Sequence, residues 1–378
     1  MNHTDKRLSY DEVSIVPEAM TNISHRDNCN CYLPCGNRRL PIFAAPMASV
    51  LSEDNWREFS DNGINVVIPR SCSLDFRLDF AMDSLCPYDF AAFSLAEVIE
   101  YFINDYDPNS KHTYNICIDV ANGHMKDVID VVRDLKSKYG ERATVMAGNI
   151  ANPKAYELYN NAGADYVRCG IGGGSACLTS SNTGVYYPYF SLLKEISEEK
   201  EYLRGKCKIV ADGNIRGYGD IQKALIYADF VMIGGLFNKA IESAGRTTYG
   251  KFYWTFGNRR IMRPLKTLFM YGREVKERNR ERAAELMRTG HADIWKEHFG
   301  MSTKKAQRLI NHDAERDDKQ LRTAEGKIEK REAEYTIRGW IENETDYLRS
   351  AMSYTNSRTL NDYKKSMWVS LGIKRYNE

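Results

Sequence analysis

The sequence predicts an α/β protein with the (β/α)8, or TIM-barrel, fold in one domain over residues 1–378. Eight short apolar runs recur along the chain, helical segments lie between several of them, and no Gly-x-Gly-x-x-Gly motif follows the first run. Continuous apolar runs are typical of parallel strands that are buried on both faces. Eight strand–helix units favour a barrel. A doubly wound open sheet is the alternative, but such a sheet would carry the glycine motif after its first strand.

The eight apolar runs are the expected barrel strands. In chain order they are PIFAA (41–45), INVVI (64–68), AAFSLA (91–96), YNICIDV (114–120), ATVMAG (143–148), DYVRCG (165–170), KIVADG (208–213) and DFVMIGG (229–235). Helices are expected between them over 125–139, 153–163 and 219–228. The first of these has apolar residues on one face, and the second ends at a glycine, which is a helix-stop signal.

The pattern changes after the eighth run. Residues 258–299 are rich in charged and helix-forming residues, so we expect a helical insert there with a solvated face. Residues 312–334 are strongly polar, which indicates a mobile flap. The amphipathic run over 336–354 predicts a last helix that closes the barrel.

Charge and cysteine content indicate which partners and which cellular compartment to expect. A formal net charge of +2 over 378 residues gives no reason to expect nucleic acid or a membrane as the main partner. The N-terminal residues lack the apolar core of a signal peptide, and no stretch reaches the roughly 18 apolar residues of a membrane span. Nine cysteines, an odd number, fit a reducing compartment. We therefore expect a cytoplasmic protein.

The ends of the predicted strands carry the candidate site, because barrel enzymes place their chemistry at the carboxyl ends of the strands. The segments that follow the strands are Ala45-Pro46-Met47, Pro69-Arg70, Asp119-Val120-Ala121, Asp212-Gly213-Asn214 and Gly234-Gly235, together with GIGGGSACLTSSNTGV (170–185) after the sixth run. The amides of Gly213, Gly234 and Gly235 and the hydroxyl of Ser175 favour phosphate binding. The alternative is that these glycines only form tight turns.

Cys177 is the candidate nucleophile in the glycine-rich segment. A thiolate is a strong nucleophile, and glycine neighbours leave room for a ring to reach it. The alternative is a small buried apolar residue, but Cys177 lies seven residues beyond Gly170, outside the strand. Thr179, two positions on, is placed to pass a proton.

In this order, these residues resemble the IMP dehydrogenase / GMP reductase family. Gly170 to Thr179 match every fixed position of the family's catalytic loop, and Asp212-Gly213 and Gly234-Gly235 lie where the family binds ribose and phosphate. The resemblance runs from about Leu8 to about Tyr354 and is interrupted by the insert.

Within the family the chain is most similar to the GMP reductases. The segments that carry this similarity are DVANGH (119–124), VMAGN (145–149), GMS (300–302), RTAEGK (322–327) and SAMS (350–353). The chain has no room between its second and third strands for the paired regulatory domain of most IMP dehydrogenases. Relatives are tetramers, so the resemblance implies a homotetramer.

The resemblance implies NADPH-dependent reductive deamination of GMP, or of a related purine nucleotide, to IMP and ammonia. Cys177 would attack purine C2, Thr179 and Glu325 would move the proton, and NADPH would reduce the resulting thioimidate. The implied substrate-binding residues are Met47, Ser175, Asp212, Gly213, Asn214, Gly234, Gly235, Gly300, Met301, Ser302, Arg322 and Gly326. The implied cofactor-binding residues are Arg70, Asp119, Val120, Ala121, Ile171, Gly172, Ser350 and Ser353. Gly172, Gly174, Cys177 and Ser180 would hold a monovalent cation, K+.

Five positions depart from the family pattern. Ala48 replaces an aspartate, Asn214 a glycine, Leu178 a threonine, Ser180 an arginine and Phe299 a tyrosine. A modified or deoxy purine nucleotide therefore stays open as the substrate. Two alternative functions also stay open: an IMP dehydrogenase that lacks the regulatory domain, and a non-catalytic nucleotide-binding descendant.

Overall fold

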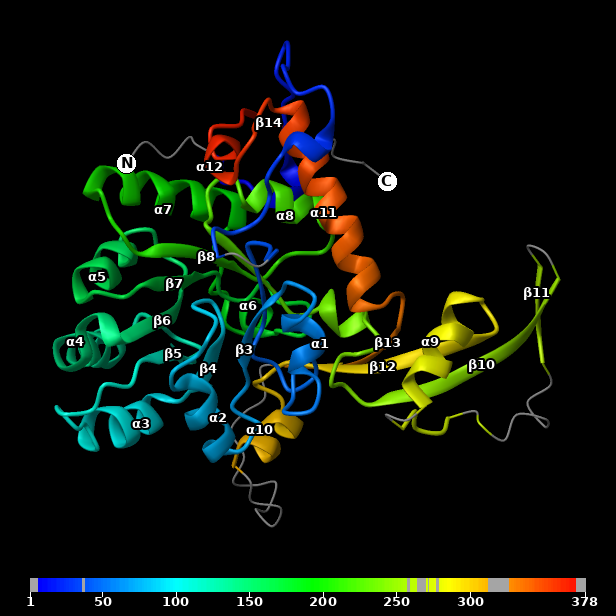
Figure 1. Ribbon diagram of the computed structural model, residues 1–378, viewed down its shortest axis with the longest axis horizontal. Coiled ribbons are helices and arrows are strands. Elements are labelled where there is room, and N and C mark those ends of the chain that lie inside the picture. Colours follow the sequence, from blue (N-terminus) through cyan, green and yellow to red (C-terminus); the bar gives the residue numbers. More distant parts are fainter. Residues whose placement is uncertain are drawn as a thin grey trace.

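Eight parallel strands form a closed barrel in the computed structural model, which describes residues 6–35, 38–256, 259–263, 270, 272–276, 279–311 and 326–371 (Figure 1). The barrel strands are β2 (Ile42–Ala44), β3 (Asn65–Ile68), β4 (Phe90–Phe93), β5 (Tyr114–Ile118), β6 (Ala143–Ile150), β7 (Tyr166–Cys169), β8 (Lys208–Asp212) and β9 (Phe230–Ile233). The first and last of them pair in parallel, with Phe43 opposite Met232. The predicted barrel is confirmed, and each of the eight apolar runs contains or overlaps one of its strands.

Side chains fill the interior of the barrel. Phe43, Phe90, Tyr166 and Phe230 form a ring of aromatic contacts with centroids 5.0 to 6.0 Å apart. Such contacts exclude water and make the barrel a packed core rather than a pore. Any ligand site must therefore lie at an end of the barrel.

Helices cover the outside of the barrel, except α6 (Thr179–Thr183), which is part of the loop after β7. The others are α1 (Trp56–Ser60), α2 (Leu74–Ala81), α3 (Leu95–Val98), α4 (Lys126–Tyr139), α5 (Ala155–Ala162), α7 (Tyr189–Leu203), α8 (Tyr218–Ala224), α11 (Ile337–Tyr354) and α12 (Leu360–Tyr363). The helices predicted from periodicity correspond to α4, α5, α8 and α11. The largest difference in a strand boundary is in the run predicted over 91–96, which ends as a strand at Phe93 because Ser94 caps α3 instead.

The insert predicted as helical over 258–299 is helical only in part, within the residues that the structure describes. Residues of this region contribute β11 (Arg259–Met262) and β12 (Ala292–Phe299) to an antiparallel sheet of order β11-β10-β12-β13, which β10 (Thr247–Phe256) and β13 (Ile328–Glu332) complete from either side in the sequence. The described part of the insert has one helix, α9 (Arg280–Arg288). The charged residues of β12 look helix-forming by composition, but their pairing with β10 is non-local, so helix propensity alone misjudges them.

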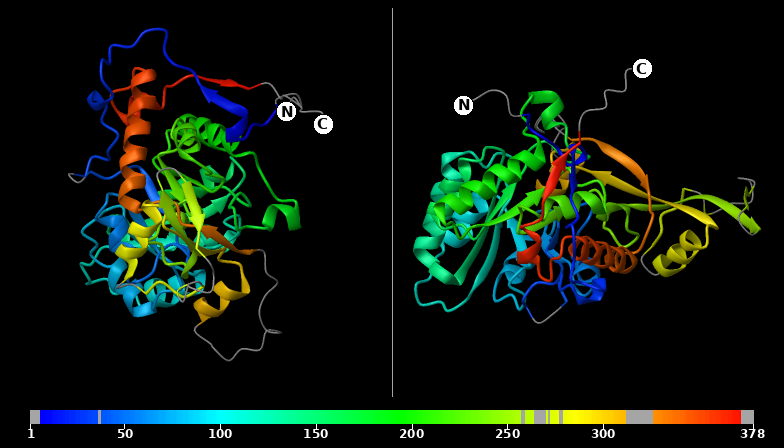
Figure 2. Two further views of the ribbon diagram at one scale, coloured as in Figure 1. Left: turned by 90° about the vertical axis from the view of Figure 1, so that its right-hand side faces the viewer. Right: turned by 90° about the horizontal axis from the view of Figure 1, so that it is seen from above.

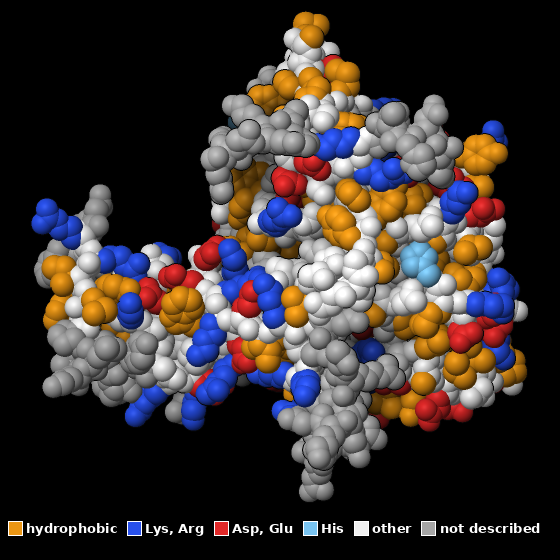
Figure 3. Space-filling model, turned by 180° about the vertical axis from the view of Figure 1, so that it is seen from behind, with side chains coloured by type: hydrophobic (Ala, Val, Ile, Leu, Met, Phe, Trp, Pro, Cys, Tyr) orange, Lys and Arg blue, Asp and Glu red, His pale blue; other side chains and the backbone are white. Residues whose placement is uncertain are grey.

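The hairpin of β10 and β11 projects away from the barrel as an arm, with α9 beside it (Figures 1 and 2). Lys and Arg side chains gather along this arm on the face that Figure 3 shows. Residues 312–325 of the predicted flap lie outside the described residues. The rest of that segment contains β13, which pairs with β12 and is therefore part of a sheet.

The two ends of the chain meet on the barrel. β1 (Val13–Ile15) pairs antiparallel with β14 (Trp368–Ser370). Among the described helices, none combines the length and the apolar character needed to cross a membrane.

A buried carboxyl group joins α11 to α8. Glu344 is 0% exposed, and the Gln222 amide nitrogen donates to its two oxygens at 3.2 and 3.3 Å. Burial raises the pKa of Glu344 well above its usual range. Desolvation is the cause of this shift, so burial favours the protonated form of Glu344 in the folded protein.

We predict that Glu344→Gln raises the free energy of unfolding at neutral pH. Above a pH of about 4.3 the unfolded chain releases a proton that the folded chain keeps. Wild-type stability thus falls by about 1.4 kcal/mol per pH unit until the raised pKa is reached. Glutamine removes this slope, so its advantage in urea unfolding is larger at pH 8 than at pH 5. Glu342→Gln, at an exposed position of the same helix, is the control; an equal advantage of Glu344→Gln at both pH values contradicts the account.

Candidate functional site

The loop after β7 closes tightly over the ring of Tyr189, the first residue of α7. A Cβ atom on Gly170 would lie 2.3 Å from the Tyr189 ring, and one on Gly173 would lie 2.4 Å from it. The Gly173 amide donates to the Tyr189 hydroxyl at 3.0 Å. These two glycines are therefore required for packing, because any side chain would push the loop off the ring.

Cys177 and Thr179 lie together on this loop. The Cys177 thiol donates to the Thr179 hydroxyl at 3.2 Å, and Cys177 is half-buried. Its backbone forms an antiparallel bridge to Gly326, and the Lys327 amide donates to the Ala176 carbonyl at 3.0 Å. The chain thus returns to the nucleophile loop just after residue 325. Arg322 and Glu325 lie outside the described residues, so their roles stay predictions.

Burial makes several other thiols of the protein less reactive. Burial raises the pKa of Cys31 and Cys86 to about 11 and that of Cys72 and Cys117 to about 12. Burial also raises the pKa of Cys169 and Cys207. These groups stay protonated at neutral pH and are poor nucleophiles, since the thiolate is the reactive form.

Two methionines and three glycines of the predicted site form one wall of the barrel mouth. A Cβ on Gly234 would lie 2.5 Å from the sulfur of Met47, and the Met301 sulfur accepts a hydrogen bond from the Ala48 amide at 3.4 Å. Gly300 packs against the Ala176 carbonyl, and Gly326 against the hydroxyl of Ser302. The structure therefore brings Met47, Gly234, Gly300, Met301, Ser302 and Gly326 next to the Cys177 loop.

A buried guanidinium that the sequence reasoning missed joins the two predicted aspartates. Arg168 donates to Asp119 at 2.7 Å and to Asp212 at 2.9 and 3.0 Å. Asn149 also donates to Asp212, at 2.8 Å. The Arg168 side chain is 9% exposed, against 17% for Asp119 and 15% for Asp212. The available signal was a charged residue inside an apolar strand, since such residues are rarely buried without a partner.

A second missed group lies beside Ser175. The Ser175 hydroxyl is 3.3 Å from His298 Nε2, and Arg331 of β13 donates to the Gly235 carbonyl at 3.4 Å. Burial, assisted by the charge of Arg331, lowers the pKa of His298 to about 4, so this imidazole is neutral. The sequence carried no specific signal for either group, because four consecutive residues of β13 are charged and only the fold shows that Arg331 is on the half-buried face.

Asn214 follows Gly213 in a left-handed conformation, with φ of +57°. Asparagine tolerates this region better than most residues, which explains how it replaces a glycine here. Its amide donates to the Gly173 carbonyl at 3.0 Å, and its side-chain oxygen accepts from Arg216. Asn214 therefore ties the loop after β8 to the loop after β7.

The predicted cation site has donors of its own. The Ser180 hydroxyl donates to the Gly172 carbonyl at 3.0 Å, and the Cys177 amide donates to the Gly174 carbonyl at 2.9 Å. Each of these carbonyl oxygens keeps a second lone pair, which is the kind of ligand that a K+ ion takes. The cation stays a prediction.

The predicted cofactor residues fall into two groups. The first group lies at the end of the barrel that carries the Cys177 loop. Asp119, Val120 and Ala121 follow β5, and Ile171 and Gly172 belong to the loop itself. Arg70 follows β3 and lies 3.9 Å from Glu97. Ser350 and Ser353 lie instead on α11, where Ser350 accepts a hydrogen bond from Arg26 and its carbonyl accepts one from Ser353.

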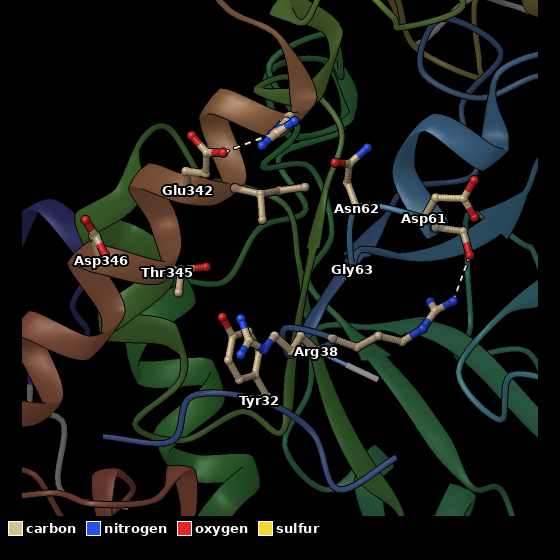
Figure 4. A pocket seen from close by; sticks show the side chains of 12 residues that line it. Tyr32, Arg38, Asp61, Asn62, Gly63, Glu342, Thr345 and Asp346 are labelled. Carbon is tan, nitrogen blue, oxygen red and sulfur yellow. Dashed lines mark hydrogen bonds and ion pairs between the residues drawn. The ribbon is translucent and has the colours of Figure 1, made fainter. Parts of the chain in front are cut away.

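A separate cavity of about 810 Å³ lies at the other end of the barrel (Figure 4). Glu342, Thr345 and Asp346 of α11 line it opposite Asp61 and Asn62, which precede β3. None of the predicted site residues lines this cavity. Because barrel enzymes act at the carboxyl ends of the strands, we place the candidate site at the Cys177 loop.

Comparisons with known proteins agree with this geometry. Residues 110–264 match the family model described as IMP dehydrogenase / GMP reductase domain. A GMP reductase of Bacillus licheniformis is 32% identical over 258 residues, which cover 65% of this chain and 76% of the relative. A GMP reductase of Staphylococcus carnosus is 31% identical over 255 residues, with 66% and 77% covered. The GMP reductase 1 of Rattus norvegicus is 40% identical over 131 residues, with 34% and 37% covered.

We predict that Arg168→Met destabilises the protein by about 3 kcal/mol in denaturant unfolding, because it leaves two half-buried carboxylates without their buried cation. Arg133→Met is the control, since Arg133 pairs with Asp130 on the exposed surface of α4 and should change stability by less than about 1 kcal/mol. A loss for Arg168→Met as small as that of the control would contradict the bridging role.

Proposed function

Because the chain belongs to the IMP dehydrogenase / GMP reductase family, we propose that it converts GMP, or a closely related purine nucleotide, to IMP and ammonia with NADPH. The observation that carries the proposal is the Cys177–Thr179 pair, 3.2 Å apart, on a loop held at the barrel mouth. The chain is an oxidoreductase of the GMP reductase type. NADPH, the covalent step and the residue roles are the parts proposed here.

The proposed reaction begins with the thiol of Cys177. Its sulfur bonds to purine C2, the bond from C2 to the exocyclic nitrogen breaks, and the thiol proton leaves with ammonia. Thr179 accepts the thiol hydrogen in the resting enzyme and passes it on, with Glu325 as the proposed partner. A covalent intermediate divides one difficult exchange into two easier steps.

Release of IMP restores the thiolate. NADPH supplies a hydride, which no side chain can provide. When C2 gains hydrogen, its bond to sulfur breaks and Cys177 takes up a proton. Asp119, Val120 and Ala121 are the proposed contacts of the cofactor, and they fit this role because they lie at the mouth beside Arg168. Asp212, oriented by Arg168 and Asn149, is the proposed partner of the ribose hydroxyls.

We also propose that the protein is a cytoplasmic homotetramer. The placement of Ser350 and Ser353 on α11, beside Arg26, supports the view that they serve the cofactor of a neighbouring subunit. No step of the proposed reaction requires K+.

We predict that purified protein with GMP consumes NADPH and releases ammonia in equal amounts. Cys177→Ala should lower this rate by at least about 10³-fold, because no other group can form the covalent bond. Cys35→Ala, at a half-buried thiol of the opposite end of the barrel, should keep the activity.

The same assay separates the alternatives. GMP, IMP and their deoxy forms are tested with both nicotinamide cofactors. NADH formation from IMP and NAD+ without reduction of GMP would contradict the proposal and identify an IMP dehydrogenase. Binding of a purine nucleotide without any turnover would identify a non-catalytic descendant.

A further inference from the structure

Two side chains of β13 face the barrel mouth, one acidic and one basic. Glu329 and Arg331 are half-buried, whereas Ile328, Lys330 and Glu332 are exposed. The Arg331 guanidinium is 18% exposed and forms a 2.7 Å ion pair with Glu329. β13 pairs with β12, which carries His298, so this face of the sheet lies against the Cys177 loop.

We propose that Arg331 binds the phosphate of the nucleotide and makes the enzyme select nucleotides over nucleosides. This inference rests on the proposed function, which supplies a purine nucleotide as the substrate class. Arg331 is a residue that neither the sequence motifs nor the resemblance assigns to the site.

The position of the guanidinium supports this role. Arg331 Nη1 lies 3.4 Å from the Gly235 carbonyl, and a Cβ atom on Gly235 would lie 3.2 Å from the same nitrogen and 2.6 Å from the Ser175 hydroxyl. The guanidinium, the hydroxyl and the glycine backbone therefore converge on one point. That point follows β9, the eighth barrel strand, where TIM barrels commonly bind phosphate.

Hydrogen-bond capacity also favours Arg331. A guanidinium has five N–H donors. Nε and Nη2 each donate to Glu329 and Nη1 donates to Gly235, so two hydrogens have no acceptor among the described residues. A planar guanidinium with free hydrogens suits a phosphate, which accepts two of them side by side.

Ser175 and His298, which lie beside the same point, are both neutral and cannot supply positive charge. Ser49 donates its single hydroxyl hydrogen to the Phe299 carbonyl at 3.2 Å, so His298 Nδ1, 3.4 Å from Ser49, must carry the imidazole proton. His298 Nε2 then accepts from Ser175. Both groups are neutral, and the resting Ser175 hydrogen is directed at the imidazole.

Glu329 balances the cations without cancelling them. It pairs with Lys327 at 2.5 Å as well as with Arg331, so two positive charges face one carboxylate. A net positive charge remains for a phosphate dianion. Glu329 also holds the guanidinium in place before the nucleotide binds, which limits the entropy lost on binding.

Binding of GMP and guanosine to the wild type and to three variants tests the inference. Arg331→Met keeps most of the side-chain stem and removes the charge, Arg331→Lys keeps a charge without the planar fork, and Lys330→Met is the matched control on the exposed face. We expect Arg331→Met to weaken GMP binding by about 10- to 100-fold in calorimetry and to leave guanosine binding unchanged. Arg331→Lys should lie between the wild type and Arg331→Met, and Lys330→Met should match the wild type.

Three outcomes would overturn the inference: wild-type protein that binds GMP no better than guanosine, an unchanged GMP affinity in Arg331→Met, or an equal loss for both ligands, which indicates a structural role. The measurement needs neither NADPH nor turnover. If the protein binds GMP without reducing it, the proposed reaction fails while the ratio of nucleotide to nucleoside affinity still decides the role of Arg331. If the protein binds IMP more tightly than GMP, the ratio of its affinities for IMP and inosine tests the role of Arg331 in the same way.

Discussion

The packing of two glycine loops on Tyr189 is the constraint on which the site depends. The ring of Tyr189 lies under Gly170 and Gly173 after β7, and its hydroxyl would be 3.0 Å from a Cβ atom on Gly213 after β8. One buried ring thus positions both the loop after β7, which carries Cys177, and the loop after β8. The hydrogen bond between Asn214 and Gly173 ties the same two loops. The glycines next to Tyr189 are needed for packing. The glycines nearer to Cys177 leave its sulfur accessible to a substrate.

Charge at the barrel mouth is organised around two guanidinium groups. Arg168 bridges Asp119 and Asp212, so it connects the proposed cofactor side to the proposed ribose side through one buried cation. Arg331 enters from β13, outside the barrel, and reaches Gly235. A barrel strand therefore orients the acidic residues, and the added sheet contributes positive charge at the proposed phosphate end. The insert that interrupts the family resemblance is joined to the site through β12, whose His298 contacts Ser175.

The fold could be predicted from the sequence where the signal is local. Buried parallel strands appear as continuous apolar runs, and all eight barrel strands follow from that pattern. The insert could not be predicted in this way, because β10 and β12 pair across a long sequence separation and charged residues in a sheet resemble those of a solvated helix. For the site, Cys177, Thr179 and the glycines carry a spaced motif. Tyr189 carries none, since its role arises only when α7 packs beneath the loop. Arg168 left a weaker signal, a charge inside an apolar strand. Arg331 left none, because its neighbours in β13 are charged as well.

The claim at the centre of this account is that the loop presents Cys177 to purine C2 for covalent bond formation. Rapid quenching of the enzyme during turnover with GMP and NADPH, followed by intact-mass analysis and peptide mapping, tests it directly. The account predicts a mass gain equal to the nucleotide less one ammonia, located on Cys177. Turnover without any nucleotide adduct, or an adduct on another residue, would contradict it.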